Sequence, residues 1–143
     1  MKMRSWLLGI VALVLLTMAA CGGGGGAPAE KAAPAGDPEA GKEIYLGVGG
    51  CGACHTIEGL EGAIGQVGPD HTHIATNATE LAKKAGVADA EAFIRQSILE
   101  PNAYIAEECP PGPCVAGVMP QTLKDTLTEQ QVNDLVAFLM QQK

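Results

Sequence analysis

The chain has 143 residues, which leaves room for one domain with its own core and some appendages, and excludes two independently cored domains. Its formal net charge is -7, from nine basic and 16 acidic residues, so nucleic acid is excluded as a partner on charge. Aromatic residues make up only 3% of the chain. The folded part therefore has few large side chains with which to fill a core, unless something else fills it.

Residues 1–21 follow the pattern of an export signal. Lys2 and Arg4 form a short basic start, and "WLLGIVALVLLTMAA" is an unbroken apolar run that leads to Cys21. A membrane-spanning helix needs about 20 residues, so this shorter run favours a cleaved signal. The ending "TMAAC" resembles the lipobox of bacterial lipoproteins, which implies that Cys21 becomes the first mature residue and carries lipid. The alternatives are an ordinary signal or an uncleaved anchor, with Cys21 as an incidental thiol.

Residues 22–36, "GGGGGAPAEKAAPAG", are expected to form a flexible tether, because they are nearly all Gly, Ala and Pro. About 15 such residues reach on the order of 20 Å. A head domain over residues 37–143 would then be anchored by lipid to the outer, extracytoplasmic face of the cytoplasmic membrane. Loss of Lys2 and Arg4 with the signal leaves seven basic residues against 16 acidic ones, a net charge of -9.

The head opens with "DPEAGKEIYLG", which predicts a helix. Asp37 suits the N-cap because its carboxylate can accept hydrogen bonds from unpaired backbone N–H groups. Pro38 suits the first helical position, where no N–H partner is needed. Tyr45 is expected to face inward, and Gly41 leaves a flat spot one turn before it.

The stretch "GGCGACHTIEG" contains two cysteines three positions apart, with a histidine directly after the second. Cys51, Cys54 and His55 form the attachment pattern of a c-type haem, in which both thiols add across vinyl groups and the imidazole coordinates iron. One such motif predicts one covalently attached haem c. A dithiol redox centre and half of a zinc site are the competing interpretations. A porphyrin would also supply the apolar filling that the aromatic-poor head lacks.

With this motif in place, residues 37–143 resemble a class I c-type cytochrome. The resemblance implies an all-α fold with about four to five short helices around the haem. It also implies that Gly41 and Tyr45 contact the last helix, and that the carbonyl of Pro69 in "VGPD" accepts the second N–H of the ligating imidazole. From the residues alone, "VGPD" is a turn. His71 stands where relatives commonly place an apolar residue.

Two helices are predicted between the motif and the next cysteine pair. Residues 79–85 are acidic at their start and carry two lysines at their end, and residues 89–100 are stopped by Pro101. No segment of the head alternates with period two for long enough to indicate a strand. The fold class predicted from the residues is therefore also all-α.

Cys109 and Cys114 enclose "PPGP". Exported proteins meet oxidising conditions, so a disulfide is expected here, and two reduced thiols are the alternative. On the chain-entropy model, a disulfide that closes so short a loop adds about 2 kcal/mol to the free energy of unfolding. Its evident effect would be to stiffen the approach to Met119.

Met119 is the expected second iron ligand. It lies in "VAGVMPQTL", where the following proline disfavours helix and keeps Met119 extended, and its position matches the Met-Pro of the family's ligand loop. Met140 is interpreted as a packing residue near the chain end. His71 and His73 are interpreted as solvated side chains, although bis-histidine iron through one of them stays open.

The last helix has the clearest local signals. Thr128 and Gln131 predict a capping box, and Leu127 with Val132 predicts a hydrophobic staple. Apolar residues then recur at helical spacing up to the end of the chain, so one face of this helix is expected to be buried.

Together, His55 and Met119 would fill both axial positions of the iron, which favours single-electron transfer over catalysis. The expected function is a membrane-tethered mono-haem cytochrome in a respiratory or photosynthetic chain, with redox proteins or complexes at the membrane as partners. It could be a mobile carrier or a subunit of a membrane complex, such as one of the alternative complex III type. The alternative is a haem-based enzyme or gas sensor with a labile distal ligand.

Overall fold

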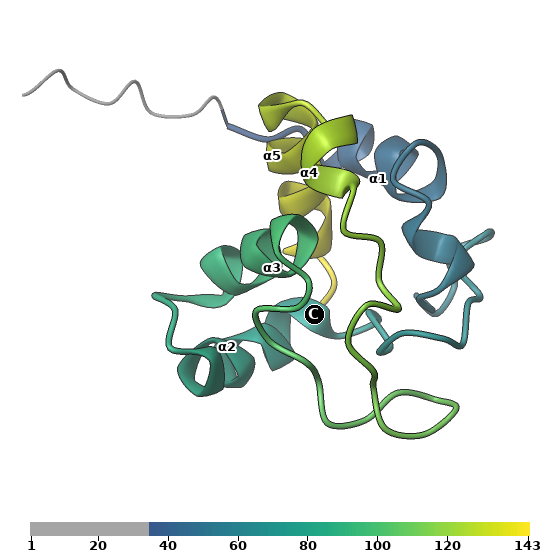
Figure 1. Cartoon of the computed structure of the whole chain (residues 1–143). Helices are drawn as coiled ribbons and strands as arrows, with labels where there is room; N and C mark the ends of the chain where they lie inside the picture. Colours follow the sequence, from purple (N-terminus) through teal and green to yellow (C-terminus); the bar gives the residue numbers. More distant parts are fainter. Residues whose placement is uncertain (1–34) are drawn as a thin grey trace, which may run out of the picture. The chain divides into compact units, whose positions relative to one another are not determined.

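The computed structural model describes residues 35–143. The predicted signal, Cys21 and residues 22–34 of the predicted tether lie outside the described residues. In chain order, the described part forms α1 (Pro38–Leu46), the 3-10 turn η1 (Cys51–Ala53), α2 (Ile74–Ala85), α3 (Ala90–Leu99), α4 (Leu123–Thr126) and α5 (Glu129–Leu139) (Figure 1). Residues 35–143 contain no strand, and their five α-helices confirm the predicted all-α class.

Helices α1 and α5 cross at close range (Figure 1). A Cβ atom at Gly41 would lie 2.0 Å from the carbonyl oxygen of Asp134, so only glycine lets the two backbones approach this closely. One turn later, Tyr45 is fully buried and its ring centroid lies 5.4 Å from that of Phe138. The expected contact of Gly41 and Tyr45 with the last helix is therefore confirmed.

The start of α1 is tied to α5 by polar contacts. The Asp37 side chain caps α1 by accepting from the N–H of Glu39 at 2.9 Å, while the N–H of Asp37 donates to Asp134 at 2.8 Å. Gly36 also lies on α5, since a Cβ there would be 2.1 Å from the carbonyl oxygen of Asn133. The prediction that the tether runs to residue 36 is wrong at this end, because Gly36 is already packed against the head.

The start of α5 has the predicted capping box. The side chain of Thr128 accepts from the N–H of Gln131 at 3.3 Å, and the side chain of Gln131 accepts from the N–H of Thr128 at 2.9 Å. Leu127 and Val132, the predicted staple, are both buried. Helix α4 was not predicted, because its four residues are too few to show a helical period.

Helix α2 begins earlier than its predicted start at residue 79. It starts at Ile74, after His73, whose side chain makes no capping hydrogen bond. Burial of Ile74, Ala75 and Ala78 stabilises the first turns of α2. This stabilisation comes from tertiary packing, which no capping residue in the sequence indicates. Helix α3 matches its prediction closely, with Asp89 accepting from the N–H of Ala92 at 2.9 Å.

The core of the described residues runs between the crossed pair α1 and α5 and the neighbouring pair α2 and α3 (Figure 1). Tyr45, Leu135 and Val136 are its largest fully buried side chains. None of the helices within residues 35–143 combines the length and apolar character needed to cross a bilayer.

Gly41→Ala is expected to destabilise the protein by about 1–3 kcal/mol, because the added methyl group overpacks the crossing of α1 and α5. Helix propensity alone would stabilise the same variant by about 1 kcal/mol, so the two effects have opposite signs. The free energy of unfolding in guanidinium chloride measures the balance. Lys42→Ala, on the exposed face of α1, is the control and should change it by less than about 0.5 kcal/mol. A stabilised Gly41→Ala variant would contradict the close crossing.

Candidate haem-binding site

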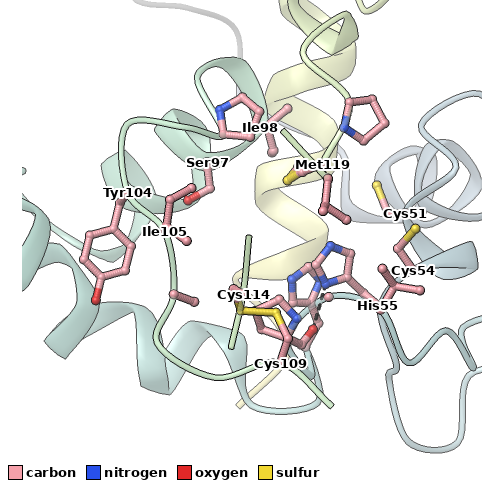
Figure 2. A pocket seen from close by; sticks show the side chains of 18 of the residues that line it. Cys51, Cys54, His55, Ser97, Ile98, Tyr104, Ile105, Cys109, Cys114 and Met119 are labelled. Carbon is pink, nitrogen blue, oxygen red and sulfur yellow. Dashed lines mark hydrogen bonds between the residues drawn. A yellow bond between two sulfur atoms is a disulfide. The ribbon is translucent and has the colours of Figure 1, made fainter. Parts of the chain in front are cut away.

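The cysteine motif forms one tight turn. Gly50 has φ 61°, in the left-handed region that favours glycine, and η1 follows directly. The N–H groups of Cys54 and His55 then donate to the carbonyl oxygen of Cys51 at 3.0 and 2.9 Å. This turn brings both thiols to the wall of one cavity, where Figure 2 shows their sulfur atoms close together. Neither thiol is in a disulfide.

A loop over residues 62–68 packs against this turn through glycines. A Cβ at Gly65 would lie 2.4 Å from the carbonyl oxygen of Ala53, and a Cβ at Gly68 would lie 2.3 Å from Cε1 of His55. Both distances are far shorter than any side chain tolerates. The loop can therefore lie directly against the His55 ring only because these positions lack side chains.

His55 is buried, with 8% of its surface exposed, and its Nδ1 lies 2.7 Å from the carbonyl oxygen of Pro69. Because a carbonyl can only accept, Nδ1 carries the proton and donates, which leaves Nε2 as the nitrogen that can bind a metal. Burial lowers the pKa of His55, although the Pro69 carbonyl opposes this shift. The imidazole is therefore neutral at pH 7, the form in which histidine ligates metals.

His71 differs from its expected solvated state. It is half-buried, and its ring stacks on that of His55 with centroids 3.8 Å apart and planes 15° apart. Its Nδ1 lies 3.2 Å from the hydroxyl oxygen of Tyr45. Two axial ligands lie on opposite faces of a porphyrin, whereas a ring stacked on His55 lies on the same side of the cavity. The geometry therefore does not favour His71 as the partner of His55 in bis-histidine ligation.

The cavity beside the motif has a volume of about 310 Å³. Its wall includes apolar side chains of α2, α3 and the loop that follows α3: Leu81, Phe93, Ile94, Ile98, Tyr104 and Ile105. The ring of Tyr104 meets that of Phe93 edge to face at 5.4 Å, which braces this wall. An apolar cavity with a few polar groups is the usual form of a cofactor site.

Met119 lines the same cavity and lies across it from His55 (Figure 2). The side chain is half-buried, and its backbone carbonyl accepts from the side-chain amide of Gln121 at 2.9 Å. The other candidate ligands lie elsewhere: Met140 lines a different cleft, between α3, α5 and Gly36, and His73 is exposed at the start of α2.

Cys109 and Cys114 are joined in a disulfide, with an S–S distance of 1.97 Å. Within the loop, Cys109 and Gly112 exchange two backbone hydrogen bonds of 2.9 Å each. Both cysteines line the cavity (Figure 2), and the chain passes directly from this closed loop to Met119. The segment that leads from Cys114 to Met119 therefore begins at a covalent cross-link.

The chemistry of the motif thiols distinguishes between haem and the other interpretations. Burial raises the pKa of Cys51 to about 11, so its thiol is protonated at neutral pH. A dithiol exchange centre depends on a thiolate with a lowered pKa, which Cys51 does not provide. Within residues 35–143, no three His, Cys, Asp or Glu side chains converge in the manner of a metal cluster. Two unlinked thiols, a neutral imidazole and a thioether around one apolar cavity fit a covalently held haem.

The sequence did not predict that Leu81 and Tyr104 line the cavity or that His71 stacks on His55. The position of Leu81 depends on which face of α2 meets the cavity, and that of Tyr104 depends on the path of the loop after α3. For His71 the sequence held a weak indication, because relatives commonly place an apolar residue at this position. An apolar residue there indicates a packed position, and the His71 ring is packed against His55.

Comparison with protein families assigns nearly all of the described residues to a known family. The family model described as "Cytochrome c" matches residues 38–143. No curated protein matches the chain. The match covers the helices and the cavity described above and includes Cys51, Cys54 and His55 in the order that the family uses for covalent haem c attachment. The chain therefore belongs to the cytochrome c family, as a class I c-type cytochrome with a covalently attached haem c.

Proposed function

We propose that the protein transfers single electrons through a haem c whose axial ligands are His55 and Met119. The observation that supports this most strongly is the placement of these two side chains on facing sides of one apolar cavity, beside both motif thiols (Figure 2). When bound, the haem supplies one-electron chemistry at the iron. The contribution of the chain is to fill both axial positions, so we infer that it has no enzymatic activity of its own.

Each side chain has a defined part in this proposal. The neutral His55 imidazole binds through Nε2 because Nδ1 is held by Pro69. A Met119 thioether on the iron would raise the reduction potential relative to a second histidine. The absorption spectra test this: we expect a low-spin haem in both oxidation states, with the weak far-red band of methionine-bound ferric haem. A high-spin spectrum in either state would contradict filled axial positions.

The proposed location is the outer, extracytoplasmic face of the cytoplasmic membrane. The support comes from the sequence of residues 1–36, namely the export signal, the lipobox-like ending at Cys21 and the Gly/Ala/Pro-rich segment that follows. Two or three acyl chains on Cys21 would hold the head at the membrane, since each buried methylene contributes about 0.8 kcal/mol.

Cys21→Ala is expected to release the head into the soluble exported fraction, because the acylated residue is removed. Fractionation of cells followed by haem staining measures the distribution. Met18→Leu, which changes the same segment but keeps the cysteine, is the control and should leave the protein in the membrane fraction. Full membrane retention of Cys21→Ala would argue for an uncleaved helix or for tight contacts with a membrane complex.

The proposed partners are redox proteins or complexes of a respiratory or photosynthetic chain. The net charge of -9, with seven basic and 16 acidic residues once Lys2 and Arg4 leave with the signal, favours docking to basic or weakly charged patches. Detergent extraction distinguishes a mobile carrier from a fixed subunit, such as one in an assembly of the alternative complex III type. A carrier elutes alone, whereas a subunit co-purifies with other proteins in fixed ratio.

A further inference from the structure

One backbone hydrogen bond and one stacked ring hold the candidate iron ligand His55. The 2.7 Å hydrogen bond from Nδ1 to the Pro69 carbonyl fixes the direction of one edge of the ring. A single bond of this kind still allows the ring plane to tilt about the line that joins the two atoms. The stacked ring of His71, with centroids 3.8 Å apart and planes 15° apart, covers one face of His55 and blocks that tilt.

His71 is itself held at both its backbone and its side chain. Its N–H donates to the carbonyl oxygen of Thr56 at 2.8 Å, and its carbonyl accepts from Ile74 at 3.1 Å. Its Nδ1 lies 3.2 Å from the hydroxyl oxygen of Tyr45. The His71 ring is therefore fixed in place rather than resting loosely on its neighbour.

Tyr45 is the anchor of this arrangement. Its side chain is fully buried between α1 and α5, where its ring packs against Phe138 with centroids 5.4 Å apart. Burial raises the pKa of the Tyr45 hydroxyl, with smaller contributions from Cys51 and Asp70, so the hydroxyl keeps its proton. The protonated hydroxyl pairs with Nδ1 of the neutral His71 imidazole in either tautomer, because a phenol can both donate and accept.

We propose that His71 is a positioning residue, held by the Tyr45 hydroxyl, that fixes the ring plane of the iron ligand His55. The proposal rests on the proposed ligation of iron by His55. It makes the crossing of α1 and α5, where Tyr45 lies, part of the structure that orients the ligand. It also explains why a histidine can occupy a packed position beside another histidine: the ring stacks on one face and its Nδ1 is paired.

The orientation of the axial imidazole plane can be measured in the ferric protein. Together with the orientation of the other axial ligand, it determines how the unpaired electron is distributed over the porphyrin, and so sets the pattern of hyperfine-shifted haem methyl signals in the proton NMR spectrum. His71→Ala is expected to change this pattern, because the covered face of His55 becomes free. His71→Phe, which restores a ring, should recover most of the wild-type pattern. His73→Ala, on the exposed neighbour, should leave it unchanged.

Tyr45→Phe provides an independent test, because it removes one oxygen atom and keeps the buried ring. It should shift the methyl pattern in the same direction as His71→Ala, by a smaller amount. If His71→Ala yields no holoprotein, Tyr45→Phe alone tests whether the proposal holds. Wild-type patterns in both variants, or in Tyr45→Phe alone when His71→Ala cannot be made, would overturn the proposal. Failure of the proposed function is seen separately, as the absence of low-spin hyperfine-shifted signals from the unmutated protein.

Discussion

Met119→Ala is expected to convert a reduced protein that does not react with carbon monoxide into one that binds it rapidly and completely. The reason is that the variant removes the thioether that lies across the cavity from His55, so the distal position of the iron has no side-chain ligand (Figure 2). Absorption spectroscopy of the reduced protein, before and after addition of the gas, measures the change.

The matched control is Met140→Ala, which deletes the same side chain from a residue that lines the other cleft. It should remain as unreactive as the unmutated protein. Rapid binding of carbon monoxide by the unmutated protein would favour a gas sensor or haem enzyme with a labile distal ligand. An unreactive Met119→Ala variant would show that another group occupies the distal position.

Replacement of both motif cysteines, Cys51→Ala with Cys54→Ala, is expected to abolish covalent haem and to leave the head largely unfolded. An empty cavity of about 310 Å³ costs roughly 7 kcal/mol at about 24 cal/mol per Å³, as an upper bound that takes no account of collapse. That is comparable to the whole stability of a small domain, about 5–15 kcal/mol. Circular dichroism should show the loss of most helical signal.

A matched pair elsewhere in the chain serves as the control. Cys109→Ser with Cys114→Ser also removes two cysteines, but it leaves the motif turn intact. This variant should keep its haem and its helical signal, and should lose only about 2 kcal/mol of stability. A motif variant that stays fully helical without haem would mean that the described core is sufficient by itself.

Local signals predicted the ends of the domain well. The caps at Asp37 and Thr128 each depend on residues within three positions in the chain, so the information is contained in a short stretch of sequence. The motif at Cys51, Cys54 and His55 is equally local, since one turn of backbone positions all three. Each of these features can therefore be predicted from a few neighbouring residues.

Features that depend on distant contacts were predicted poorly. The start of α2 has no capping side chain and is determined by burial of Ile74 against the core. Gly36 was assigned to the tether because its composition matches, yet it packs against a residue almost a hundred positions later. His71 stacks on His55 and contacts the hydroxyl of Tyr45, 26 residues earlier in the chain, and no local pattern connects these residues.

Covalent attachment of one haem c through Cys51 and Cys54 underlies every other role assigned to this cavity. The most direct test is the intact mass of the full chain after expression with a working haem-attachment system, followed by reaction with a thiol reagent. We predict the mass of the processed polypeptide plus one haem, with neither motif cysteine available to the reagent. The mass of the bare polypeptide, with both motif thiols reactive, would show that no haem is attached.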